Sequence, residues 1–254
     1  MNQRVTSGIV IVVVTVATIL IGGIFLKLAG FLICLYGSYE LVKCIRYKFD
    51  ILSYIITVLI SLLIYIDYNN ATLYALLGLL IMFIVSIFSE EREIDDLSLL
   101  LVMSLILSAS THYFIYLSQI SKWLLGFAFI IAYITDAFSF YLGSRFGKHK
   151  LNERVSPNKT IEGSIFGWLG GFLVSFLYAL LFNYFGLNKN LIIVFSLFLP
   201  LVSQIGDLAF SLLKRHYGIK DFSNLIPGHG GLLDRIDSVS YVCLLMGIVL
   251  TFIG

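Results

Sequence analysis

The chain has 254 residues, of which 59% are hydrophobic and only 13% are charged, and its net charge at pH 7 is +2. Soluble domains carry about 25% charged residues, so this composition excludes an ordinary soluble protein, and the small net charge gives no indication of nucleic-acid binding. The apolar residues form long unbroken runs, which only helices surrounded by lipid tolerate. We therefore predict an all-α, polytopic membrane protein without a soluble domain.

The apolar runs define the expected transmembrane helices, each of which needs about 20 mostly apolar residues. The first two runs are separated only by Lys27 and nearby glycines, so they form either a tight hairpin or one broken unit. No cleavage site follows the first run, which is expected to act as an uncleaved anchor. Nine spans are predicted, at residues 5–25, 28–45, 50–67, 71–89, 97–118, 122–143, 163–185, 190–212 and 234–253.

Basic residues predict the orientation of these spans, because cytoplasmic loops carry an excess of lysine and arginine. With nine spans, the N-terminus and every second loop share one side, which holds 14 of the 17 basic residues. The other side holds only Lys27, Lys122 and Lys189. We therefore expect a multi-pass protein of a bacterial-type inner (cell) membrane, with a cytoplasmic N-terminus and an external C-terminus.

The chain divides into two parts that differ in polar content. Residues 1–120 contain spans with simple loops, expected to pack, face lipid and provide dimer contacts. Residues 121–254 form the expected catalytic region, with two cytoplasmic loops at 144–162 and 213–233. The three cysteines, Cys34, Cys44 and Cys243, lie in or beside apolar runs without metal-type spacing, which indicates small packing residues.

Carboxylates interrupt the spans of the second part. Asp136 falls inside the sixth span and Asp207 inside the eighth, whereas Asp234 opens the ninth and is followed by Asp237. An aspartate at the centre of a membrane helix costs about 2.5–3.5 kcal/mol, so each needs a cation, a polar partner or a wet cavity. Asp234 and Asp237 are three residues apart and therefore share a helix face.

Residues Ser203, Asp207, Ser211 and Lys214 form a polar stripe along one face of the eighth span, because they recur at helical spacing. The stripe runs into a basic loop that ends at Asp234. Converging carboxylate oxygens suit Mg²⁺, which binds through one or two carboxylates plus substrate phosphates. The sequence therefore predicts a magnesium site at the cytoplasmic side.

The two loops supply groups that complement phosphate. Cationic side chains can bind phosphate oxygens, and the small residues from Gly228 to Gly231 let backbone amides approach an anion. Taken singly, each group also fits a structural ion pair or a transport path. Their joint order, from a polar stripe through a basic loop and glycines to paired carboxylates, favours a membrane enzyme that handles phosphates.

The run from Ser211 to Asp237 resembles the signature of phosphatidate cytidylyltransferases, also called CDP-diacylglycerol synthases. That signature contains Ser-x-x-Lys-Arg, Lys-Asp, Pro-Gly-His-Gly-Gly and Asp-Arg-x-Asp, all of which are present here. The likeness covers about residues 130–240 and includes Arg145 to Lys148, Ser156 to Gly163 and Gly206-Asp207. It departs from the family at Asp136 to Ser139, where Gly-Ala is expected after the first two residues.

The resemblance implies that CTP and phosphatidic acid react to CDP-diacylglycerol and pyrophosphate in phospholipid biosynthesis, with the lipid phosphate attacking the α-phosphorus. It implies Mg²⁺, a second, monovalent cation such as K⁺, and a homodimer. It assigns catalysis to Asp207, Asp234, Asp237, Lys214, Arg215 and His229; substrate binding to Ser156, Lys159, Thr160, Glu162, Ser211, Lys220, Asp221, Gly230, Gly231 and Arg235; and metal binding to Asp207, Asp234, Asp136 and Asp237.

Two alternatives remain open from the residues alone. The loops do not distinguish phosphatidic acid from an isoprenoid lipid phosphate or a lipid alcohol as the acceptor. A transporter using the intramembrane aspartates is the other alternative. Transporters of this kind are built from paired repeats with discontinuous helices, and no internal repeat is visible in the sequence.

Overall fold

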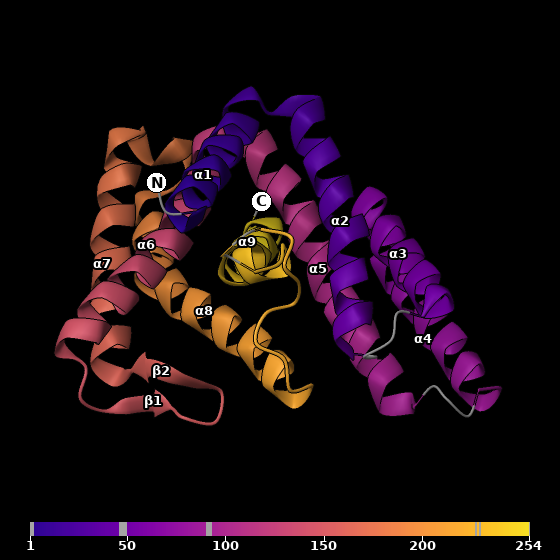
Figure 1. The fold of residues 1–254 in the computed structure, drawn as a ribbon. Helices are drawn as coiled ribbons and strands as arrows, with labels where there is room; N and C mark the ends of the chain where they lie inside the picture. Colours follow the sequence, from indigo (N-terminus) through magenta and orange to yellow (C-terminus); the bar gives the residue numbers. More distant parts are fainter. Residues whose placement is uncertain (1–2, 46–49, 90–92, 227, 229, 254) are drawn as a thin grey trace. The chain divides into compact units, whose positions relative to one another are not determined.

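The computed structural model describes residues 3–45, 50–89, 93–226, 228 and 230–253, without the side chains of residues 3–6. This part of the chain is helical apart from one short hairpin, as the predicted all-α class requires (Figure 1). The elements are α1 (Gln3–Ile21), α2 (Gly23–Ile45), α3 (Ile51–Ile66), η1 (Tyr68–Asn70), α4 (Ala71–Ile87), α5 (Ile94–Ile120), α6 (Lys122–Phe146), β1 (Lys150–Asn152), β2 (Ser156–Thr160), α7 (Ile161–Leu181), η2 (Asn183–Gly186), α8 (Lys189–His216) and α9 (Leu233–Ile253).

Each predicted span coincides with one α-helix, but the number of membrane crossings is confirmed only in part. Within the described residues, seven helices are long and apolar enough to cross a membrane. The segment Ser7–Ile21 of α1 and the helix α3 are shorter. At a rise of 1.5 Å per residue, α3 extends about 24 Å, less than the roughly 30 Å hydrocarbon core. That these two helices also cross stays a prediction.

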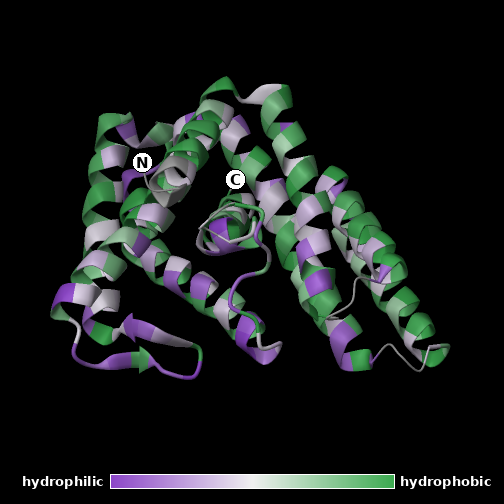
Figure 2. Ribbon diagram, in the orientation of Figure 1, coloured by the Kyte–Doolittle hydropathy of each residue, from purple (hydrophilic) through white to green (hydrophobic). Residues whose placement is uncertain are grey.

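Large apolar side chains cover the outside of the helices, as expected for surfaces in contact with lipid. Val12, Val13 and Val14 of α1 are more than half exposed, and Leu76 and Leu80 of α4 are similar. Figure 2 shows hydrophobic residues along most helices, whereas hydrophilic residues gather on the hairpin β1–β2 and at the C-terminal end of α8. All three cysteines are buried, which fits the predicted packing role.

The chain forms two compact units that are discontinuous in sequence. The first comprises Met1–Ile115 and Asp221–Arg235, and the second comprises Tyr116–Lys220 and Ile236–Gly254. The loop after α8 and the first residues of α9 therefore belong with the N-terminal helices, and the rest of α9 belongs with α6 to α8. Candidate functional groups are consequently present in both units.

Glycines determine how closely α6 and α7 pack in the second unit. Gly163, Gly167 and Gly171 recur every four residues, so they form one face of α7. A Cβ at Gly163 would lie 2.9 Å from the Cα of Gly143, and one at Gly167 would overlap the hydroxyl of Ser139. Small residues allow such close approach of helices in membranes. This seam fixes the start of α7, and with it the hairpin, against the end of α6.

Polar contacts connect α7 to α8. The indole nitrogen of Trp168 donates to the carbonyl of Leu197 at 2.8 Å. The side chain of Gln204 donates to the carbonyl of Ser164 at 3.1 Å and accepts from its hydroxyl. Buried hydrogen bonds of this kind set the register between helices more sharply than apolar packing does, because an unpaired polar group is costly in hydrocarbon.

The loop predicted at 144–162 contains an antiparallel hairpin. Strand β1 pairs with β2 so that Lys150 lies opposite Thr160 and Asn152 lies opposite Ser156. Thr160 ends β2 and caps α7, because its side chain accepts a hydrogen bond from the amide of Gly163 at 3.1 Å. The cap turns the chain directly from strand into helix, which leaves Lys159 two residues before the start of α7.

Candidate functional site

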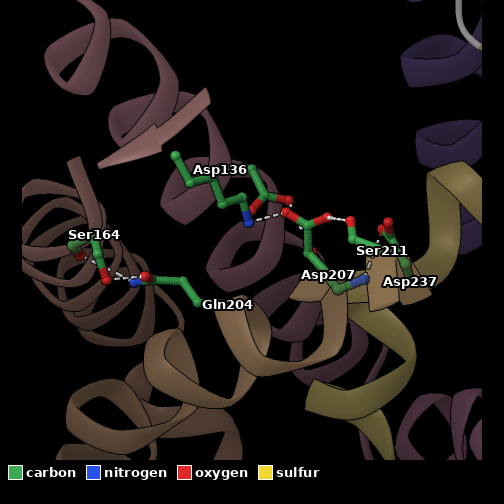
Figure 3. Close-up of polar contacts among 8 residues, drawn as sticks. Asp136, Ser164, Gln204, Asp207, Ser211 and Asp237 are labelled. Atoms are coloured by element: carbon green, nitrogen blue, oxygen red, sulfur yellow. Dashed lines mark hydrogen bonds and ion pairs between the residues drawn. The ribbon is translucent and has the colours of Figure 1, made fainter. Parts of the chain in front are cut away.

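Three carboxylates from three helices of the second unit point toward one another, as Figure 3 shows. Asp136 comes from α6, Asp207 from α8 and Asp237 from α9. Asp237 is only 8% exposed and is repelled by the charges of Asp207 and Asp136. We call these three residues the carboxylate cluster. Buried like charges are unfavourable in hydrocarbon, so the cluster requires cations.

Lys159 supplies one of these cations. Its ammonium group forms an ion pair with Oδ2 of Asp207, and both side chains are about a quarter exposed, at 24% and 22%. The hydroxyl of Ser211 donates to the other oxygen of Asp207 at 3.4 Å. The sequence predicts Lys159 on a loop and Asp207 in a helix, and the two residues are 48 positions apart in the chain. The structure brings their side chains together.

Lys214 supplies a second cation from the end of α8. It is 7% exposed, and its charge attracts Asp237. Ser203 and Ser211 on the same face of α8 are also buried, so this part of the polar stripe lies inside the protein. Next to Asp207, a Cβ at Gly206 would lie 2.9 Å from the carbonyl oxygen of Asp237, so glycine allows α9 to approach α8 at this point.

Ser238 is a member of the site that sequence analysis did not identify. Its hydroxyl donates to Oδ2 of Asp136 at 2.9 Å, and its amide donates to Oδ1 of Asp237 at 2.8 Å. One serine therefore connects two members of the carboxylate cluster. Its position directly after Asp237 was the available signal, but the partner on α6 is 102 residues away and emerges only from the fold.

The donor set of the cluster fits Mg²⁺, because carboxylate oxygens are hard ligands. In the described part of the chain, no group of three or more histidine, cysteine, aspartate or glutamate residues is arranged to hold a metal ion by itself. Mg²⁺ generally binds through one or two carboxylates and completes its shell with water and substrate phosphates.

Glu162 orders the hairpin loop. Its Oε2 accepts the amides of Lys148 and His149 at 3.0 and 3.2 Å, and its Oε1 lies 2.6 Å from Nδ1 of His149. Together with the Thr160 cap, these bonds hold the turn between α6 and β1 against the first turn of α7. These contacts show Glu162 and Thr160 ordering the loop, and the substrate binding expected of both residues stays a prediction.

The glycine-rich loop of the first unit is held by two carboxylates. Oδ2 of Asp234 accepts the amides of Phe222 and Gly231, both at 2.9 Å. Glu40 of α2, which sequence analysis did not single out, accepts further hydrogen bonds from this loop. Gly230 has a φ of +80°, a conformation that favours glycine. The amide of Gly231 is thus engaged with Asp234 within the protein.

The remaining predicted site residues lie on the loops or outside the described residues. Arg215 is exposed and donates from Nη1 to the carbonyl of Ile219 at 2.9 Å. Lys220 and Asp221 are exposed, and Ser156 begins β2. The Nε atom of Arg235 is buried and has no hydrogen-bond partner among the described residues. His229 lies outside the described residues, so its predicted role stays a prediction.

The fold and the site together define an integral membrane protein of helices that carries a buried cluster of carboxylates with lysines beside it. A family model described as "Cytidylyltransferase family" matches residues 2–253. The chain belongs to this family, as the motifs between residues 130 and 240 predicted.

Relatives of this chain carry a more specific name. The phosphatidate cytidylyltransferase of Staphylococcus epidermidis is 33% identical over 261 residues, covering 98% of this chain and 99% of the relative. That of Staphylococcus saprophyticus is 31% identical, with the same coverage. That of Staphylococcus aureus is 44% identical over 124 residues, covering 49% of this chain and 47% of the relative.

Proposed function

We propose that this chain is a membrane cytidylyltransferase that converts CTP and phosphatidic acid to CDP-diacylglycerol and pyrophosphate. The observation that supports this most strongly is the likeness over 98% of the chain to relatives named phosphatidate cytidylyltransferase. The carboxylate cluster and its lysines supply groups that the reaction needs. In this reaction an oxygen of the lipid phosphate bonds to the α-phosphorus of CTP, and the bond to the β-phosphate bridge breaks. Pyrophosphate leaves with that electron pair.

The residues of the second unit have distinct roles in this proposal. Lys159 and Lys214 bind phosphate oxygens in this proposal, because both carry positive charge beside the carboxylate cluster. One or two carboxylates of the cluster, Asp207 and Asp237 before Asp136, would hold Mg²⁺, and the bound ion would neutralise charge that builds up on the phosphates. The attacking phosphate is already anionic, so positioning and charge neutralisation are sufficient and no protein nucleophile is needed.

The finer assignments carried by the resemblance remain part of the proposal. Asp234 is a further metal ligand of the reaction, a monovalent cation such as K⁺ is a second cofactor, and the protein works as a homodimer. Arg215, Lys220 and His229 bind phosphate, and Ser156 and Arg235 contact substrate. The N-terminus and both polar loops face the cytoplasm, which the distribution of basic residues supports.

The reaction is tested with purified protein in lipid vesicles, by measuring release of pyrophosphate that depends on CTP. Phosphatidic acid, an isoprenoid phosphate and a lipid alcohol are compared as acceptors. We expect release with phosphatidic acid, whereas activity with another acceptor alone would replace the proposed substrate. An inactive protein that moves solute instead would favour transport.

Topology is tested with single cysteines introduced into a background that lacks the three natural ones. Positions Lys150 and Lys220 should react only with a reagent on the cytoplasmic side, and Asn188 only from outside. Labelling of Lys150 and Lys220 from opposite sides would contradict the proposed orientation.

A further inference from the structure

Glu40 lies in the apolar helix α2 and is a fully buried carboxylate. The proposed reaction assigns it no role. Glu40 is 0% exposed and accepts three hydrogen bonds from one loop of the first unit. These come from the hydroxyl of Ser223 at 2.6 Å and from the amides of Leu232 and Leu233 at 2.9 and 2.8 Å. A carboxylate is costly in this environment, so three charge-assisted hydrogen bonds to one segment indicate a specific task.

Glu40 and Asp234 hold the same loop at both of its ends. Asp234 accepts hydrogen bonds from the amides of Phe222 and Gly231, which lie at opposite ends of the loop. Glu40 accepts from the residue that follows each of these, namely from the hydroxyl of Ser223 and the amide of Leu232. Residues 222–233, which we call the clasped loop, are therefore closed at their base by two carboxylates from α2 and α9. Inside the loop, Ile226 and Gly230 form a further backbone bridge.

The hydrogen bonds of Glu40 also determine how α9 begins. The first amides of an α-helix have no partner within the helix and carry partial positive charge. Glu40 accepts from the amide of Leu233, the first residue of α9, and from the amide of Leu232, the residue directly before it. A carboxylate from α2 thus serves as the cap of another helix, and the residue that follows directly is Asp234.

Gly231 allows this arrangement because it has no side chain. A Cβ at this position would overlap the carboxylate of Glu40, with its Cδ at 2.8 Å. At Gly230 a Cβ would lie 2.8 Å from Oδ2 of Asp234. The two glycines of the signature are therefore required for close contact with the two carboxylates that clasp the loop.

We infer that Glu40 is a positioning residue of the enzyme, which holds the clasped loop and the first turn of α9 so that Asp234 keeps the orientation that turnover requires. The inference rests on the proposed function, in which Asp234 takes part in the reaction. A merely structural role would make Glu40 important for folding but not for the geometry of this loop in the folded protein.

The test combines hydrogen exchange with turnover, both on the full chain in lipid nanodiscs. Glu40→Gln keeps the shape of the side chain but replaces one carboxylate oxygen, an acceptor, by an NH₂ group, a donor. That NH₂ group would face a donor of the loop, so a hydrogen bond is lost. We expect amide exchange in residues 222–233 to accelerate by about tenfold or more, and the maximal rate with CTP and phosphatidic acid to fall by about tenfold or more. Glu40→Asp, which retains the charge, should recover part of both losses.

Ser38→Ala is the matched control. Ser38 is also fully buried on α2, but its hydroxyl lies against Ser61 of α3 rather than the clasped loop. This variant should leave loop exchange and turnover unchanged. If it changed both as much as Glu40→Gln does, general disturbance of α2 would explain the effects and the inference would fall.

Other outcomes are equally decisive. If the amides of the clasped loop exchanged in Glu40→Gln at the wild-type rate, Glu40 would not hold the loop. If they exchanged faster but turnover stayed at the wild-type rate, Glu40 would hold the loop without being a positioning residue. If Glu40→Gln does not fold, Gly231→Ala takes its place, because it keeps the charge of Glu40 and disturbs only the contact between Glu40 and the loop. Normal amide exchange and normal turnover in Gly231→Ala would contradict the inference. If the wild-type protein released no pyrophosphate in the presence of CTP, the proposed function would be wrong. Amide exchange does not depend on that function, so the two failures can be distinguished.

Discussion

The ion pair between Lys159 and Asp207 predicts a measurable link between the hairpin and metal binding. Lys159→Met removes the charge while it keeps most of the length and apolar surface of the side chain. In wild-type protein without ligand, Lys159 neutralises Asp207 within the carboxylate cluster. The variant leaves the repulsion among Asp136, Asp207 and Asp237 opposed mainly by Lys214.

The expected size follows from the exposure of the pair. Hydrogen bonds to charged groups contribute about 1.5–3 kcal/mol when buried, and exposed ion pairs about 0.2–1 kcal/mol. Both side chains here are about a quarter exposed, so we expect a loss of about 1–2 kcal/mol in unfolding free energy. For a chain of this length that corresponds to a melting temperature lower by roughly 2–8 °C.

The assay is thermal unfolding in detergent, with and without Mg²⁺. Because Lys159 competes with a metal ion for Asp207, Mg²⁺ should raise the melting temperature of Lys159→Met more than that of the wild type. Lys150→Met is the matched control on the same hairpin, since its ammonium group donates to the carbonyl of Pro157 at 2.5 Å. This control should shift stability by no more than about 0.5 kcal/mol.

A double-mutant cycle with Asp207→Asn decides whether the two residues interact. We expect a coupling free energy of about 1–2 kcal/mol in the absence of Mg²⁺. A coupling near zero would show that the ion pair does not form in the free protein. An equal response of Lys159→Met and wild type to Mg²⁺ would refute competition between the lysine and the metal.

Three further predictions concern the second unit. Asp237→Asn should insert normally yet lose nearly all turnover, and Mg²⁺ should stabilise it less against heat than it does the wild type; near-normal activity at ordinary Mg²⁺ would exclude Asp237 as a ligand. Lys214→Ala should lower the maximal rate severely with a smaller effect on the apparent KM for CTP, and a change in KM alone would make it a docking residue. Gly167→Ala should destabilise the protein by about 1–3 kcal/mol in thermal unfolding, because its Cβ would overlap Ser139 and lie 2.7 Å from the carbonyl of Thr135. Gly126→Ala, whose Cβ meets mainly the hydroxyl end of Tyr178, is its control and should be tolerated; equal losses in both variants would refute close packing of α6 on α7.

The class of protein and the position of its helices follow from local sequence patterns. Long apolar runs leave few alternatives to membrane helices, because lipid cannot satisfy exposed backbone groups. The polar stripe through Asp207 was also visible, since helical spacing places its members on one face. The family was predicted from the motif between Ser211 and Asp237, where chemistry restricts residue types at fixed spacing.

Which side chains meet in the candidate site becomes visible only in the folded protein. Nothing in the spacing of Lys159 and Asp207 indicates an ion pair, since that contact depends on the glycine seam between α6 and α7 and on the cap at Thr160. In the sequence, Glu40 is one charged residue near the end of an apolar run. Its hydrogen-bond partners, Ser223 and Leu232, lie more than 180 residues further along the chain. Contacts between distant segments depend on how whole helices pack, which local sequence patterns do not record.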